Sequence, residues 1–360
     1  MIDLTESDPS RCGLGWDAAE LGEILGEAAV PTREATPRAL PPARDAVASY
    51  LAGRGASVAP DRIHFTSSRS EAHRLLLKLL CGAGDEVLVA SPSQPFLDRL
   101  AAAQSLRVGR YALVYDGEWR LDRRSLARAV TRRTRAILLG NPSQPTGAIL
   151  SSEDLAFLED LCSARDLALI CDEALADTAL VPSASVLEAT RCLTFHVSGL
   201  SGVCGLPRLG AEWLAAAGPA ALVATALERL QPLLDAQPPR PASAQLALPV
   251  LLARRERYLA ALRDRLATNR ASLAAAALRE SAWSLLSGPA GCSAVLQIGA
   301  AEEEESLCLA LLAEGVAVQP GFLHGFPRPG YLVVSLLPPP EQFGEGLARL
   351  DRRLRAPLFR

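Results

Sequence analysis

The strongest constraint on the fold of this 360-residue chain is a regular alternation of short apolar segments with longer amphipathic ones. Between residues 43 and 171, each short apolar run is followed by a segment with apolar residues at helical spacing. Such an alternation predicts βαβ crossovers and a mainly parallel sheet covered by helices on both faces. The expected strands are 61–66, 85–90, 107–114, 134–140 and 167–171, and the expected helices are 43–51, 70–80, 92–103, 126–133 and one that starts at Ser152.

The character of the sequence changes at the proline-rich stretch 237–241. A long helix is expected over 251–278, followed by strands at 293–298 and 331–337 and a final amphipathic helix over 341–354. We therefore predict three parts. Residues 1–49 form an N-terminal arm and part of a small domain, 50–235 form a large α/β domain, and 236–360 form the C-terminal small domain with its connecting helix.

Composition excludes several classes of partner. The formal net charge is only −3, so nothing favours nucleic acid or an anionic membrane, and no apolar run is long enough to span a bilayer. The eight cysteines and four histidines are dispersed without the spacing of metal ligands, so no metal site is expected. The N-terminus lacks the pattern of a signal peptide, and we expect a cytoplasmic protein.

Three motifs occur in order along the predicted sheet. Residues 141–147 read Asn-Pro-Ser-Gln-Pro-Thr-Gly after a buried strand, Asp172-Glu173 ends the next strand, and residues 200–207 read Leu-Ser-Gly-Val-Cys-Gly-Leu-Pro. Together they resemble the class I/II aminotransferases, enzymes of fold type I that depend on pyridoxal 5′-phosphate (PLP). The resemblance covers nearly the whole chain. It implies an α/β fold with a large, mainly parallel domain and a smaller α+β domain, a homodimer, and an amino-acid substrate.

In that family a lysine holds PLP as an imine and moves a proton on the substrate carbon. Gly202 stands at this lysine position, and glycine has no side chain that could form an imine. Lys78, the single lysine of the chain, lies in the predicted helix 70–80, roughly 12 Å along it from Ser70. A lysine that reaches solvent from a buried helix explains Lys78 better than an imine does. The resemblance therefore leaves PLP without a covalent anchor.

Each of the other positions expected to contact the cofactor either keeps the expected residue type or has a different one. The carboxylate that would face the pyridinium nitrogen is present as Asp172, whereas the stacking aromatic is Gln94 and the amide for the ring oxygen is Gln144, in the same loop as Asn141. The aromatic residue expected after Asp172-Glu173 is Leu175. The candidate cofactor-binding residues are Asp172, Gln144, Asn141, Ser68, Arg69, Ser70, Gln94 and Arg208.

Two alternatives remain open for the residues that would bind the cofactor phosphate. Ser68 and Ser70 can bond a phosphate, and Arg69 can either pair with it or fill its place. If two residues have been lost, Arg208 is the basic phosphate ligand. In the ungapped register, which Trp213 favours, Gly210 stands there.

The leading hypothesis is an aminotransferase-like protein without ordinary transaminase turnover, either a pseudoenzyme or an enzyme that uses the old cleft without PLP. PLP would then be bound non-covalently at most, and a small amino-acid-like molecule would occupy the cleft. His196 is a candidate catalytic base, although a core histidine is the favoured interpretation. One alternative is an active PLP-dependent aminotransferase. The other is an amino-acid-binding or regulatory partner, in a homodimer or paired with an active paralogue.

Overall fold

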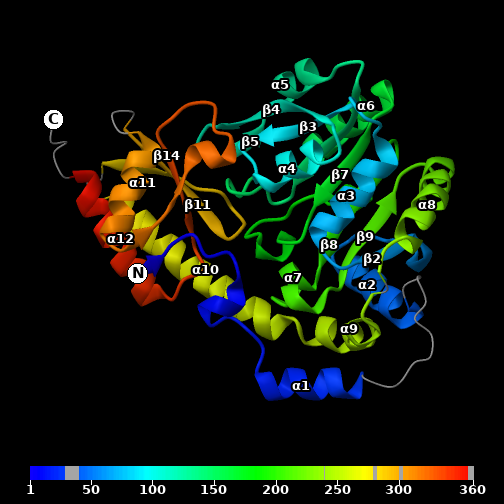
Figure 1. Cartoon of the computed structure of the whole chain (residues 1–360), viewed down its shortest axis with the longest axis horizontal. Helices are drawn as coiled ribbons and strands as arrows, with labels where there is room; N and C mark the ends of the chain where they lie inside the picture. Colours follow the sequence, from blue (N-terminus) through cyan, green and yellow to red (C-terminus); the bar gives the residue numbers. More distant parts are fainter. Residues whose placement is uncertain (29–39, 239, 279–281, 300–302, 356–360) are drawn as a thin grey trace.

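The computed structural model describes residues 1–28, 40–238, 240–278, 282–299 and 303–355. A large α/β unit and a smaller α+β unit lie side by side, and helix α10 (Glu256–Ala277) runs along the smaller one (Figure 1). Residues 29–39 of the predicted N-terminal segment fall outside the described ranges.

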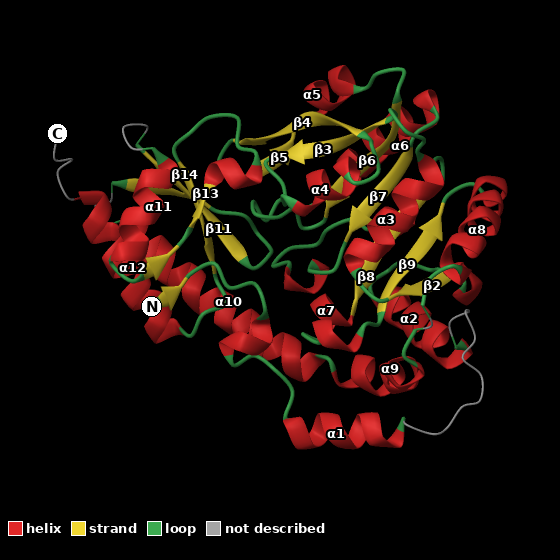
Figure 2. Ribbon diagram, viewed as in Figure 1, coloured by secondary structure: helices red, strands yellow, loops and turns green. Residues whose placement is uncertain are grey.

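A mainly parallel sheet forms the centre of the large unit (Figure 2). Five neighbouring strands, from β8 to β4, run parallel, whereas β9 is antiparallel to both of its neighbours and β5 is antiparallel to β4. The predicted parallel sheet is thus confirmed. In spatial order, the strands described in this sheet are β2 (Ile63–Thr66), β9 (Glu212–Ala217), β8 (Thr194–Gly199), β7 (Ala168–Asp172), β6 (Thr134–Gly140), β3 (Glu86–Ser91), β4 (Arg107–Tyr115) and β5 (Trp119–Leu121).

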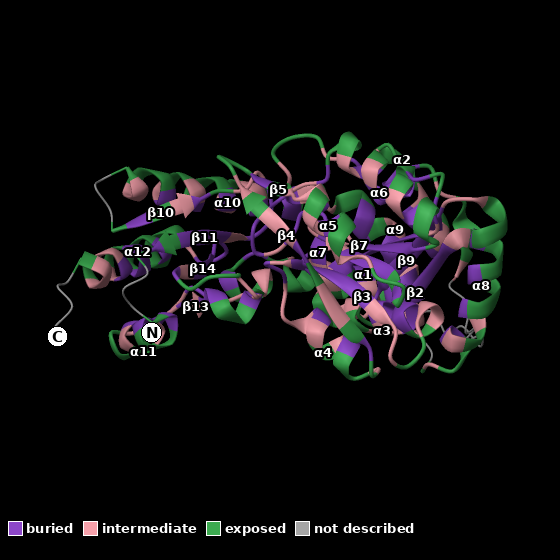
Figure 3. Cartoon of the chain, turned by 90° about the horizontal axis from the view of Figure 1, so that it is seen from above, coloured by how far each residue is buried: buried purple, intermediate pink, exposed green. Residues whose placement is uncertain are grey.

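Both faces of the central strands are buried, because alternate residues of β3, β6, β7 and β9 enter different cores. In β3, Val87 and Val89 pack with helices α3, α4 and α8, whereas Leu88 and Ala90 pack with α5 and α6. Figure 3 shows the strands as buried between helices whose outer surfaces are exposed. The helices of this unit are α2 (Pro41–Gly53), α3 (Arg69–Leu80), α4 (Phe96–Ala102), α5 (Arg123–Ala129), α6 (Ser152–Arg165), α7 (Leu200–Val203), α8 (Ala220–Asp235) and α9 (Ala242–Arg254).

The smaller unit has its own core around Leu262, Leu296 and Phe343. A sheet in the order β10-β11-β14-β13 packs on helices α10 and α12, and the N-terminal strand β1 pairs with β12. Helix α1 (Ala18–Glu27) lies against α9. The remaining elements are β1 (Ile2–Asp3), β10 (Trp283–Leu286), β11 (Ser293–Ile298), α11 (Glu304–Ala313), β12 (Val316–Ala317), β13 (Gln319–Pro320), β14 (Tyr331–Ser335) and α12 (Pro340–Arg355).

Three helix predictions were wrong in their limits. The helix expected over 251–278 is two helices that meet at Arg255, because α9 packs into the large unit and α10 into the small one. Helix α4 starts at Phe96 rather than at residue 92, since the preceding loop contains two prolines and is held by a bond from Ser93 N–H to the His324 carbonyl. Helix α5 starts at Arg123 because the Asp122 side chain caps it.

The predicted border at residues 235/236 places α9 with the small domain. In the structure Leu248 and Leu251 of α9 pack with α2 and with β2 and β9 of the large sheet. Helical periodicity in the sequence cannot tell which unit α9 packs into, because α9 and α10 both have apolar faces.

Candidate functional site

A cleft of about 430 Å³ opens at the carboxyl ends of the parallel strands, between the two units. This edge is where open α/β sheets usually bind ligands. An inner pocket continues from it toward β6 and β7 and shares Arg69, Gln94, Gln144 and Leu175 with the outer cleft. Residues from the N-terminal arm (Thr5, Glu6, Ser7), from Ser201-Gly202 and from the small unit (Ser293, His324, Val333) complete the lining.

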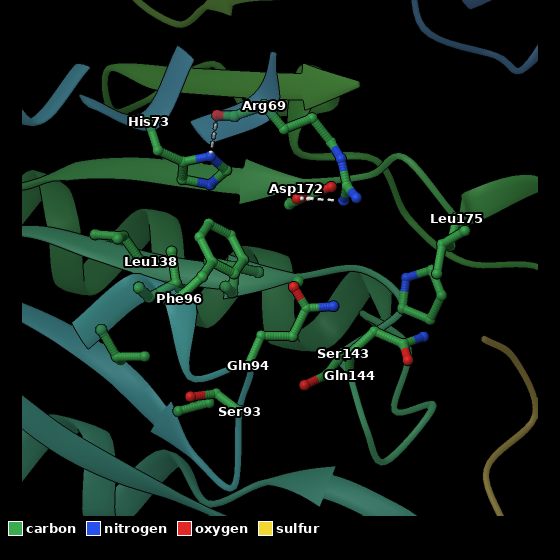
Figure 4. Close-up of a pocket in the computed structure, with 16 residues that line it drawn as sticks. Arg69, His73, Ser93, Gln94, Phe96, Leu138, Ser143, Gln144, Asp172 and Leu175 are labelled. Carbon is green, nitrogen blue, oxygen red and sulfur yellow. Dashed lines mark hydrogen bonds and ion pairs between the residues drawn. The ribbon is translucent and has the colours of Figure 1, made fainter. Parts of the chain in front are cut away.

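Asp172 ends strand β7 at the floor of this cleft and forms an ion pair with Arg69. Arg69 Nη1 donates to Asp172 Oδ2 at 2.9 Å, and Ala174 N–H donates to Asp172 Oδ1 at 3.1 Å (Figure 4). Burial alone would raise the pKa of Asp172, but Arg69 and these hydrogen bonds outweigh it and hold the pKa below its ordinary value. The carboxylate is therefore ionised and already has a cationic partner from its own chain.

Gly202 lies in helix α7 and is buried beside the loop that follows Asp172. A Cβ built at Gly202 would lie 2.0 Å from the carbonyl oxygen of Ala174 and 2.9 Å from its Cβ. The first contact is with backbone, which cannot rotate away as a side chain can. The lysine position therefore lacks an amine and also lacks room for any side chain in this backbone conformation.

Gln94 and Gln144 reach the same pocket from two loops. Gln94 lies across the pocket from the Arg69–Asp172 pair (Figure 4). Gln144 Oε1 accepts a bond from Ser293 Oγ at 3.1 Å, while its Nε2 is buried without a partner in the described structure. Leu175 lines both parts of the cleft at the position expected for an aromatic residue.

Asn141, a predicted cofactor-binding residue, lies outside the cleft, whereas His196 takes the core position that was its favoured interpretation. Asn141 donates to the Ala184 carbonyl at 2.7 Å and accepts from Leu150 N–H at 2.9 Å, so its side chain closes a loop and does not line the cleft. His196 is fully buried in strand β8, with its Nε2 3.7 Å from a Glu173 carboxylate oxygen. Burial lowers the pKa of His196 to about 3, so the ring is neutral at physiological pH.

The expected phosphate site at the start of α3 holds a carboxylate of the chain. Ser68 caps the helix by accepting from Glu71 N–H, and both Ser68 and Ser70 are exposed. The Glu71 carboxylate accepts bonds from Ser67 N–H at 2.7 Å and from Ser67 Oγ at 2.6 Å, and it forms an ion pair of 3.1 Å with Arg240.

The two candidate basic positions differ in location. Arg208 is exposed on a short 3-10 helix and does not line the cleft. Gly210 lies beside this phosphate site, since a Cβ built on it would be 3.6 Å from the Ser67 carbonyl oxygen. Its φ of +62° disfavours any residue with a side chain there.

Sequence reasoning missed two acids next to the site. Glu212 is buried at the start of β9 and accepts bonds from Ser201 N–H at 3.0 Å and Ser201 Oγ at 2.7 Å. Burial raises its pKa to about 7. A glutamate inside the apolar run 211–217 was a readable signal of a buried carboxyl group. The Ser68-x-x-Glu71 spacing indicated an acid near a helix start, although Glu71 bonds the N–H of Ser67 and not that of Ser68 as in a capping box.

These residues do not fit PLP in the way the resemblance implies. The carboxylate expected to face the pyridinium nitrogen is paired with Arg69, and the imine position is closed by Ala174. Lys78 is exposed near the end of α3 and lines neither part of the cleft.

In the parts of the chain that the structure describes, no group of three or more His, Cys, Asp or Glu side chains is placed to hold a metal ion.

Comparisons with known proteins agree on ancestry and fold. Residues 26–350 match the family described as aminotransferase class I and II. An alanine aminotransferase of Mycobacterium bovis is 28% identical over 316 residues, which cover 82% of this chain and 71% of the relative. The solved alanine aminotransferase of Pyrococcus furiosus superposes with a TM-score of 0.92 at 21% identity, covering 98% of this chain and 92% of that one. A tyrosine aminotransferase of Leishmania infantum gives 0.89 at 20% identity, with coverage of 98% and 90%. Among the helices described, none is both long and apolar enough to cross a membrane.

Proposed function

We propose that this chain, which belongs to the class I and II aminotransferase family, lacks ordinary transaminase turnover and binds a small amino-acid-like molecule in the old cleft. The family depends on PLP. Family membership alone supports an active enzyme, because the named relatives are aminotransferases of alanine and tyrosine. The site supports a pseudoenzyme instead, since function depends on the residues of the site rather than on the fold.

The observation that carries this proposal is the 2.0 Å approach of the Gly202 Cβ position to the Ala174 carbonyl oxygen. A lone substitution of lysine by glycine would leave an empty channel beside residue 202. Here the backbone of the neighbouring loop occupies that channel, so the surroundings match a residue without a side chain. Any PLP in this cleft would be held without a covalent bond.

The cleft still suits a small polar ligand. Its volume of about 430 Å³ lies within the usual range for small-molecule sites. Arg99 brings positive charge to its wall, whereas the charge of Arg69 is balanced by Asp172, and the Gln144 amide has an unpartnered donor. A carboxylate of an amino acid suits Arg99, and its other polar groups suit the Gln144 amide.

Assembly and location are part of the same proposal. We expect a cytoplasmic dimer, formed either with a second copy or with an active paralogue that this chain regulates. Light scattering of the purified chain, alone and mixed with such a paralogue, distinguishes these two forms.

The deciding experiment is the visible spectrum of the purified protein with added PLP, before and after borohydride, followed by peptide mapping. We expect no imine absorbance that maps stoichiometrically to one lysine, and no transfer of an amino group from alanine to a 2-oxo acid. The Lys78→Arg variant is the control, because it removes the single lysine. A reducible imine that disappears in this variant, or measurable amino-transfer, overturns the proposal in favour of an active PLP-dependent enzyme.

A further inference from the structure

We infer that the chain's own side chains replace the charges of the cofactor, at the ring-nitrogen end of the old cleft and at the expected phosphate site beside it, so that the cleft rejects pyridinium phosphate ligands even when no covalent bond is required. This inference rests on the proposed function and sharpens it, because it says which ligands the cleft excludes. Arg69 is the residue that decides this specificity.

The ring-nitrogen end of the cleft holds a guanidinium. Arg69 projects from the first turn of α3 and lines both parts of the cleft. Its Nη1 is 2.9 Å from Asp172 Oδ2, with the two side chains 32% and 15% exposed. A protonated pyridine needs that same carboxylate. It would have to displace a charge-assisted hydrogen bond that is already formed inside a largely buried site.

Residues around the start of α3 and a second acid also surround the Arg69 position. His73, one turn later, bonds the Arg69 carbonyl through Nδ1 at 2.8 Å, and its ring packs edge-to-face on Phe96 of α4. The buried Glu212 also attracts the Arg69 guanidinium. Two carboxyl groups of the chain, Asp172 and Glu212, therefore attract the Arg69 guanidinium, which favours the observed placement over one that swings toward solvent.

The expected phosphate site, beside the cleft at the start of α3, is occupied by acidic side chains of the chain itself. Glu71 takes the Ser67 N–H and hydroxyl donors at the start of α3, and Glu212 takes the N–H and hydroxyl of Ser201, the residue before Gly202. A phosphate ester carries a charge of about −1.5 to −2 at neutral pH. It would approach these acids and compete with them for donors, so both electrostatics and hydrogen bonding oppose its entry.

Two fluorescent probes separate the two ends. Pyridoxamine carries the ring without the phosphate, and pyridoxamine 5′-phosphate carries both, while neither has an aldehyde that could react with amines. We expect wild-type protein to bind both with Kd above about 1 mM. Arg69→Ala should bind both at least tenfold more tightly because Asp172 becomes available, and Glu71→Gln should tighten only the phosphorylated probe. Arg99→Ala is the matched control, since it removes an exposed arginine of the same cleft that is not paired with Asp172.

Each result decides the inference. Micromolar binding of pyridoxamine 5′-phosphate by wild type overturns it, and this arm needs no variant to fold. A folded Arg69→Ala protein that binds pyridoxamine no better than wild type or Arg99→Ala also overturns it. Tight non-covalent binding of pyridoxamine 5′-phosphate without a reducible PLP imine overturns this inference and leaves the proposed function intact. A reducible PLP imine at one lysine overturns the proposed function instead.

Discussion

Arg69 and Asp172 are 103 positions apart in sequence and form an ion pair of 2.9 Å at the floor of the cleft. In the family that this chain resembles, the carboxylate serves the cofactor ring. Here it serves an arginine, and Asp172 in turn raises the pKa of Arg69 above its ordinary value. This pairing gives Asp172 a partner within the chain itself, whether or not a cofactor is present.

Breaking the ion pair should destabilise the protein measurably. Arg69→Ala leaves Asp172 ionised and largely buried, and we expect the free energy of unfolding to fall by about 2–3 kcal/mol. This is less than for a fully buried pair, because Arg69 is 32% exposed. Asp172→Asn should cost a similar amount, and the double variant much less than the sum. Additive losses in a urea-denaturation cycle would show that the two side chains do not interact in solution.

Restoring a side chain at position 202 should damage the fold rather than recover activity. Gly202→Ala forces a Cβ against the Ala174 carbonyl, and we expect a loss of about 3 kcal/mol of unfolding free energy. Gly202→Lys should also fail to form a reducible imine with PLP. Gly22→Ala is the control, because Gly22 lies exposed in helix α1 with open space around its Cβ position, and it should stabilise by about 0.5–1 kcal/mol. A Gly202→Ala protein as stable as wild type would refute the closed position.

Glu212 should make stability fall as pH rises toward neutrality. Burial raises its pKa from 4.5 to about 7, so the protonated folded form gains stability that is fully present below pH 4.5 and is lost as pH rises through 7. The loss attributable to this residue is about 3 kcal/mol over that window. Urea denaturation of wild type and Glu212→Gln at pH 5, 6, 7 and 8 isolates the contribution of Glu212. The difference in unfolding free energy between the two proteins should change with pH. Parallel curves would contradict a raised pKa.

His196 should act in the opposite direction at lower pH. Its folded pKa of about 3 lies below the ordinary value of 6.5, so the unfolded chain takes up a proton first as pH falls below 6.5. Between pH 6 and 4.5, the free energy of unfolding of wild type should fall by up to about 1.4 kcal/mol per pH unit relative to that of His196→Leu. At pH 7.5 the variant should keep any ligand binding of the cleft, because His196 does not line it. Loss of binding with retained stability would revive His196 as a site residue.

The sequence alone determined the family, the mainly parallel α/β sheet and the absence of an amine at Gly202. These features depend on local patterns: strand periodicity, motifs of a few residues, and the chemistry of one side chain. The same local signals placed Asp172 correctly at a strand end, where the sheet brings it to the cleft. They could not tell that Asn141 bonds backbone, although they already favoured the core position that His196 takes.

Only the tertiary structure showed which groups meet at the site. Arg69 meets Asp172, Ser201 meets Glu212, and Ala174 closes over Gly202 because separate loops converge at the carboxyl ends of parallel strands. The distances between those groups depend on how helices and strands pack, to within fractions of an ångström, and no sequence interval encodes them. For this reason the glycine at position 202 was readable from the chain, while the pairing of Arg69 with Asp172 was not.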